Sequence, residues 1–193
     1  MVDEEPKLLF FEEEGGFQLR YRRSKAAGGT YFFTVNLADR TSGLLVQKID
    51  VLRQVMRTIR HRHPFTIVAM VVLPDHLHSL WRLPLDDANY PMRWSLIKAG
   101  FSRLMPREGF VRKSREKKRE RGIWQRRYWE HQIRDETDLA RHLDYIHFNP
   151  VKHGYVTRAV DWRFSSIHRF IEKGWLTADW GAGFKIEAGE FGE

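Results

Sequence analysis

Two apolar segments joined by a short polar turn occupy the middle of the chain. Residues 65–73, FTIVAMVVL, form an unbroken apolar run, which is typical of a central strand buried on both faces of a sheet. Pro74 and Asp75 follow this run and indicate a tight turn. The next segment, HLHSLWRL, reads as the returning strand. The pair therefore predicts two adjacent strands in the core of a folded domain.

Strand and helix patterns also lie on either side of these two segments. Residues 30–37, TYFFTVNL, are rich in β-branched and aromatic residues, and residues 128–133, YWEHQI, offer a fourth strand. Apolar residues recur at helical spacing in residues 45–61 and 91–105. The order βαββαβ, followed by one more helix, predicts an α+β fold: a ferredoxin-like sandwich with an added C-terminal helix.

Length and composition limit the class of protein. The 193 residues are 42% hydrophobic and 13% aromatic, so the chain can bury a core. No apolar run approaches the roughly 20 residues that span a bilayer, and there are no cysteines for disulfides or thiolate metal sites. We expect a soluble intracellular protein with an acidic extension at 1–16, one domain at 17–155, and an aromatic-rich tail at 156–193. This tail should pack on the domain as irregular structure or short helices.

The positive charge is concentrated in two clusters. Residues 107–127 contain ten Lys or Arg against three Glu, in a chain whose net charge is +8. A second cluster is LRYRRSK, and aromatic residues are interleaved with both clusters. The two clusters could form a solvated surface, or they could bind a polyanion, for which nucleic acid is the leading candidate. The candidate contacts with nucleic acid are Arg20, Arg22, Arg23, Arg112, Lys113, Lys117, Lys118, Arg119, Arg126 and Arg127.

A histidine pair, His76 and His78, begins the second strand of the central pair. Side chains two residues apart on a strand point to the same face, with Cα atoms roughly 6.6 Å apart. The two imidazoles can therefore converge on one metal ion while Leu77 points into the core. A similar triplet, HRH at 61–63, closes a basic helix beside a proline and is expected at the surface.

The segment HLDYIHFNP, residues 142–150, reads as the end of an amphipathic helix. Its apolar stripe contains Leu143 and Ile146. A second stripe consists of Asp138, His142, Tyr145 and Asn149. Their spacings of four, three and four residues place them on another face of the same helix. A tyrosine in the middle of a polar stripe is a candidate for chemistry.

Taken together, these segments resemble the HUH single-strand endonucleases. More closely, the chain resembles the single-tyrosine insertion-sequence transposases and, among them, the REP-associated tyrosine transposases. The resemblance rests on four segments in the family's order: GGTYFFTVNL, VVLPDHLHSLWRLP, IWQRRYWEHQIRD and DYIHFNPVKHGYV. A later segment, DWRFSSIHRF, is also similar, and together they span about residues 28 to 170.

The resemblance implies a nucleophile and a metal site. Tyr145 would attack a phosphate of single-stranded DNA and keep the 5′ phosphate, while a free 3′-OH leaves. Mg²⁺ or Mn²⁺ would be held by His76, His78 and Asn149 and would act as a Lewis acid. Because Pro150 disfavours helical geometry at Asn149, that residue could instead cap the helix end.

Two other histidines compete as the third metal ligand. They are His142, one turn before Tyr145, and His131, in the fourth strand. Each could instead have a purely structural role: His142 as a residue on the helix surface, and His131 as a hydrogen-bonded histidine in the sheet. Lys152 and His153 are candidates to contact phosphate, although a lone basic residue after a helix is usually solvated.

The resemblance also implies the substrate, which is an imperfect DNA hairpin with a short single-stranded guide at its 5′ foot. We expect a protein that acts in the bacterial cytoplasm at the nucleoid, without a membrane partner. A monomer is expected, and a dimer, as in related insertion-sequence enzymes, is the alternative. Two alternatives stay open. One is a catalytically silent hairpin-binding protein of the same fold, and the other is an unrelated histidine-based metal phosphoesterase in which Tyr145 only packs.

Overall fold

The computed structural model describes residues 26–106 and 122–182. The predicted order of strand, helix, strand, strand, helix, strand and final helix is confirmed, with α1 as an additional short helix before α2. The elements are β1 (Thr30–Asn36), α1 (Leu44–Gln47), α2 (Ile49–Arg62), β2 (Thr66–Val72), β3 (His76–Arg82), α3 (Tyr90–Leu104), β4 (Trp129–Gln132), α5 (Glu136–Lys152), the 3-10 helix η1 (Ala159–Asp161) and α6 (Ile167–Glu172).

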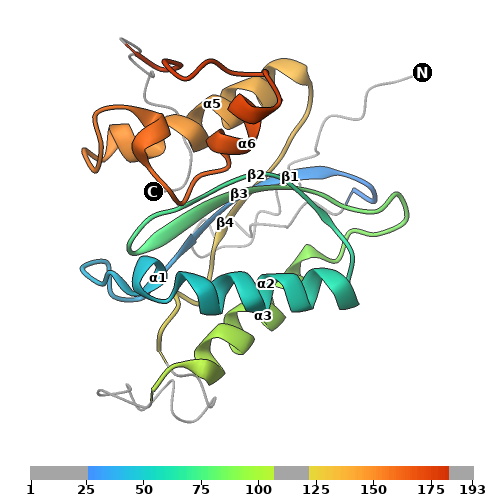
Figure 1. Cartoon of the computed structure of the whole chain (residues 1–193). Helices are drawn as coiled ribbons and strands as arrows, with labels where there is room; N and C mark the ends of the chain where they lie inside the picture. Colours follow the sequence, from blue (N-terminus) through green and yellow to red (C-terminus); the bar gives the residue numbers. More distant parts are fainter. Residues whose placement is uncertain (1–25, 107–121, 183–193) are drawn as a thin grey trace, which may run out of the picture.

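The four strands form one antiparallel sheet in the order β2-β3-β1-β4. Helices α2 and α3 cover one face, and α5 and α6 lie over the other (Figure 1). Strand alternation divides β1 between two cores. Tyr31, Phe33 and Val35 belong to the core under α2 and α3, whereas Phe32 packs with Tyr145 on the α5 side.

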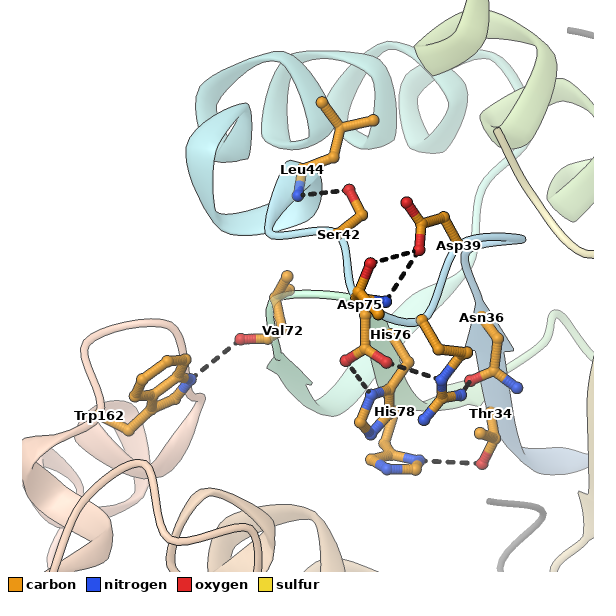
Figure 2. Close-up of polar contacts among 12 residues, drawn as sticks. Thr34, Asn36, Asp39, Ser42, Leu44, Val72, Asp75, His76, His78 and Trp162 are labelled. Atoms are coloured by element: carbon orange, nitrogen blue, oxygen red, sulfur yellow. Dashed lines mark hydrogen bonds and ion pairs between the residues drawn. The ribbon is translucent and has the colours of Figure 1, made fainter. Parts of the chain in front are cut away.

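The position of β2 differs from the prediction, because β2 is an edge strand and not a central one. Its apolar character has two physical causes. Both faces are covered by helices, and the chain near residue 165 runs along its outer edge. Val72 N donates to Phe164 O (2.9 Å), Ser166 N donates to Met70 O (2.8 Å), and Trp162 Nε1 donates to Val72 O (2.9 Å; Figure 2). The backbone groups of this edge are therefore paired, as a central strand's would be.

Helix α5 begins at an N-cap, where the Asp135 side chain accepts from Asp138 N. It continues through Pro150 to Lys152, so Asn149 lies within the helix and does not cap its end. Asn149 and Pro150 are both buried. This burial against the sheet outweighs the local preference that predicted an earlier end.

The HRH triplet lies at the end of α2, where His61 is exposed and His63 is half-buried. None of the helices in the described part of the chain is long and apolar enough to cross a membrane.

Candidate active site

His76 and His78 lie side by side at the start of β3, on the face that α5 covers (Figures 1 and 2). Their ring centroids are 5.0 Å apart, and both side chains are almost fully buried. Leu77 belongs to the opposite core, with α2 and α3. The alternation of the strand thus brings the two imidazoles together beneath the C-terminal helix.

Each imidazole is oriented through its Nδ1 atom (Figure 2). The Nδ1 of His76 donates to Asp75 Oδ1 (2.8 Å), and the other oxygen of that carboxylate pairs with Arg40 Nε (2.6 Å). The Nδ1 of His78 is hydrogen-bonded to Thr34 Oγ1 (2.9 Å). A carboxylate behind an imidazole is a typical support for a metal-binding histidine, because it fixes the tautomer and turns Nε2 toward the ligand. The donor set therefore fits a divalent cation.

Tyr145 lies beside this pair, with its ring centroid 5.1 Å from that of His78. Only 2% of the side chain is exposed. Its hydroxyl accepts a hydrogen bond from Lys152 Nζ (3.1 Å), and the same ammonium lies 4.8 Å from the ring centroid. An ammonium at this position stabilises negative charge on the phenolic oxygen. The contact follows from helix geometry, since residues seven apart lie on one face two turns away from each other.

Asn149 and His142 flank Tyr145, one turn to either side on α5, and both are buried. His142 contacts a group of residues other than the pair His76 and His78. Its ring stacks on His131, with centroids 4.7 Å apart, and its Nδ1 donates to Asp138 O (2.7 Å). The Phe32 ring contacts both groups, with its centroid 4.7 Å from that of His142 and 5.5 Å from that of His78.

His131, Asp138 and His142 form the one group of three His, Cys, Asp or Glu side chains with closely spaced ligand atoms among residues 26–106 and 122–182. Its nitrogen and oxygen atoms lie within 4.8 Å of one another, so by donor type it could hold a metal. The group is already hydrogen-bonded, because His131 Nε2 donates to Asp138 Oδ2 (2.7 Å) and Arg134 N donates to the same oxygen (3.1 Å). We interpret it as a network that fixes the start of α5 against β4.

The charge states in this network follow from its contacts. Burial raises the pKa of Asp138, but hydrogen bonds from His131 and Arg134 lower it, and the pKa ends below its ordinary value. The carboxylate is therefore ionised. Desolvation by burial lowers the pKa of His142, which favours the neutral imidazole.

Most of the predicted DNA contacts lie outside the described residues. Arg126 and Arg127 are described, and both are exposed. The others fall in residues 1–25 or 107–121: Arg20, Arg22, Arg23, Arg112, Lys113, Lys117, Lys118 and Arg119.

Several residues of the site were not predicted in these roles. Asp75 and Thr34 support the histidines, and Lys152 contacts the Tyr145 hydroxyl, while its contact with phosphate stays a prediction. The adjacent Asp-His pair at 75–76 and the spacing of seven between Tyr145 and Lys152 were the available signals.

Comparisons with known proteins give a consistent set of relatives, although no protein-family model matches the sequence. The chain is 49% identical over 162 residues to a Haemophilus influenzae protein assigned by name to the REP-associated tyrosine transposases. This alignment covers 83% of this chain and 92% of the relative. It is 42% identical over 160 residues to the REP-associated tyrosine transposase of Escherichia coli K12. That alignment covers 83% of this chain and 89% of the relative.

A solved structure is also similar over nearly the whole chain. It is that of a REP-associated tyrosine transposase bound to a REP hairpin, with a TM-score of 0.78 and 39% sequence identity. The similarity covers 91% of this chain and 98% of that one.

Proposed function

Because this chain belongs to the family of REP-associated tyrosine transposases, we propose that it cleaves and rejoins single-stranded DNA next to hairpins of the REP type, with Tyr145 as nucleophile. The observation that carries the assignment is the place of the Tyr145 hydroxyl, bonded to Lys152 and beside the ring of His78. The hairpin-bound relative supports the choice of substrate.

The reaction is a phosphoryl transfer to the tyrosine. The Tyr145 oxygen forms a bond to phosphorus, the bond from phosphorus to the 3′ oxygen breaks, and the phenolic proton is lost as the 3′ oxygen gains one. Lys152 stabilises the negative charge of the phenolate before attack, which an unassisted phenol at neutral pH would rarely carry. Since the product is a phosphodiester of tyrosine, a 3′-OH can reverse the step and rejoin strands.

We assign the divalent cation to His76, His78 and Asn149. Two imidazoles and one amide oxygen form a mixed set that accepts Mn²⁺ or Mg²⁺. A cation bound there would polarise a non-bridging oxygen of the scissile phosphate. The contacts of His142 with Asp138 and His131 support Asn149 over His142 as third ligand. The ring contact between Tyr145 and His78 of the same chain supports catalysis by a monomer.

The test is to trap a covalent adduct. Wild-type protein incubated with labelled single-stranded hairpin DNA and Mn²⁺ should give a band that survives denaturing electrophoresis. Tyr145→Phe should give none while still binding the hairpin, because only one oxygen is removed. The matched control is Tyr155→Phe, which changes a half-exposed tyrosine and should leave the adduct intact. An adduct with Tyr145→Phe at the wild-type level would refute the assignment.

A further inference from the structure

A groove of about 230 Å³ lies at the outer edge of β2, between α2 and residues 163–169. Its charged lining consists of four arginines, Arg53 and Arg60 from α2 and Arg163 and Arg169 from the C-terminal segment. Two of its apolar lining residues, Ile67 and Met70, pack against the core under α2 and α3. The groove therefore lies at the sheet edge, between α2 on one face and the segment that leads into α6 on the face that bears Tyr145.

The arginines of this groove, which we call the arginine groove, carry a surplus of positive charge. Arg53 meets Asp50 at 3.4 Å on the exposed surface, and Asp50 is the only carboxylate that the four arginines contact within the described part of the chain. Arg60 and Arg169 donate to backbone carbonyls, which leaves their charge in place. Arg163 lies 4.9 Å from the centroid of the Phe164 ring. Three positive charges thus remain to attract an anion.

The groove is held open by hydrogen bonds that do not depend on a ligand. The Ser166 hydroxyl accepts from Met70 N (2.9 Å) and is hydrogen-bonded to His147 Nε2 of α5 (3.0 Å). Ser166 N donates to Met70 O (2.8 Å). The segment that carries Arg163 and Arg169 is therefore fixed to both β2 and the helix of Tyr145.

The positive charge extends along α2 beyond the groove. Arg53, Arg57 and Arg60 follow spacings of four and three, and all three are exposed on one face. Seven helical residues cover about 10 Å. Phosphates of one duplex strand follow each other about every 3.4 Å along its axis, so this stripe matches several consecutive phosphates.

We propose that the arginine groove and the adjoining face of α2 bind the phosphate backbone of the double-stranded hairpin stem. The inference rests on the proposed function, which names the hairpin as ligand. The strand to be cleaved must reach Tyr145 under α5, and the groove lies at the β2 edge, between α2 on one sheet face and residues 163–169, which lead into α6 on the other. A stem held at this edge adjoins the sheet face that bears Tyr145. Arginines that contact phosphates position the protein on the DNA but do not read its base sequence.

The experiment replaces Arg53 and Arg163 by Gln, because neither makes a hydrogen bond to the backbone that the fold requires. Arg62→Gln with Arg103→Gln is the matched control, since both residues are exposed on helices and neither lines the groove. Binding is measured on full-length protein against salt concentration, with a hairpin and with a stemless oligonucleotide of the same single-stranded sequence. For the hairpin, the slope of log K against log salt should become shallower by about 0.9 for each phosphate that the variant no longer neutralises.

The stemless oligonucleotide should bind the Arg53→Gln, Arg163→Gln double variant as it binds wild type. A hairpin slope equal to that of the control variant would overturn the proposal. An equal weakening on the stemless oligonucleotide would also overturn it, because the groove would then hold single strands. Adduct formation at saturating hairpin should persist in the double variant. If wild type forms no adduct, the proposed function fails, whereas the slope still reports on the groove.

Discussion

Lys152 is the residue that we propose adjusts the reactivity of Tyr145. Its ammonium contacts both the hydroxyl and the ring of Tyr145. Replacement by Met removes the charge at an exposed position, so folding and DNA binding should be retained. Cleavage should slow by about a hundredfold or more, as when other groups that stabilise developing charge are removed. Single-turnover cleavage measures this, with Lys152→Arg as the control that keeps the charge. A Met variant with the wild-type rate would show that Lys152 only packs.

The choice of third metal ligand is also a matter of single residues. Asn149→Ala should sharply raise the Mn²⁺ or Mg²⁺ concentration needed for cleavage, because it removes a hard oxygen donor one turn from Tyr145. Asn149→Asp keeps an oxygen at that position and should need less metal than the Ala variant. Titration of the metal in nicking assays gives both values.

His142→Ala is the comparison for that titration. It should have a smaller effect, since its ring belongs to the network with His131 and Asp138. If His142→Ala shifts the metal requirement and Asn149→Ala does not, the assignment of Asn149 is wrong.

At the scale of elements, that network should make the attachment of α5 depend on pH. Burial lowers the folded-state pKa of His142 below 6.5, so below that pH the unfolded chain binds more protons than the folded one. The free energy of unfolding should therefore fall as the pH falls below 6.5. Urea unfolding at about pH 5 and pH 7 measures this decrease, and His142→Gln should reduce it. The same decrease in the variant would show that other groups cause it.

The elements were largely predictable, and the exceptions have physical causes. An unbroken apolar run, β-branched and aromatic segments, and apolar residues at helical spacing located the four strands and three long helices of the described residues, because each of these elements buries side chains in the core. The edge position of β2 was not predictable, since residues 162–166 cover it and a local apolar run does not reveal such a partner. The continuation of α5 past Pro150 also depends on tertiary packing.

The site was predictable only in part for a similar reason. Strand alternation placed His76 beside His78, and the polar stripe singled out Tyr145 as a candidate for chemistry. That this stripe is buried beside His78 was not predicted, because the apolar stripe was expected to face the core. The pairing of Thr34 with His78 depends on the register between β1 and β3. The arginine groove joins α2 to residues more than a hundred positions later, a proximity that no local pattern encodes.

For the molecule as a whole, the basic segment at 107–127 should add a second electrostatic contact with DNA. Much of it lies outside the described residues, so the prediction rests on charge alone. Replacing Lys117, Lys118 and Arg119 by Ala should make the salt slope on single strands shallower by about 0.7 for each phosphate that is no longer neutralised. The metal requirement should not change. An unchanged slope would mean that this segment is a solvated surface, and residues 20–25 would become the candidate.

The central claim is that Tyr145 carries the DNA during the reaction. Mass spectrometry of the trapped adduct after digestion with protease and nuclease tests it most directly. The peptide that contains Tyr145 should carry a nucleotide joined through its 5′ phosphate, and the released DNA should end in a free 3′-OH. A nucleotide on another residue, or cleavage of the DNA with no modified peptide at all, would contradict the account.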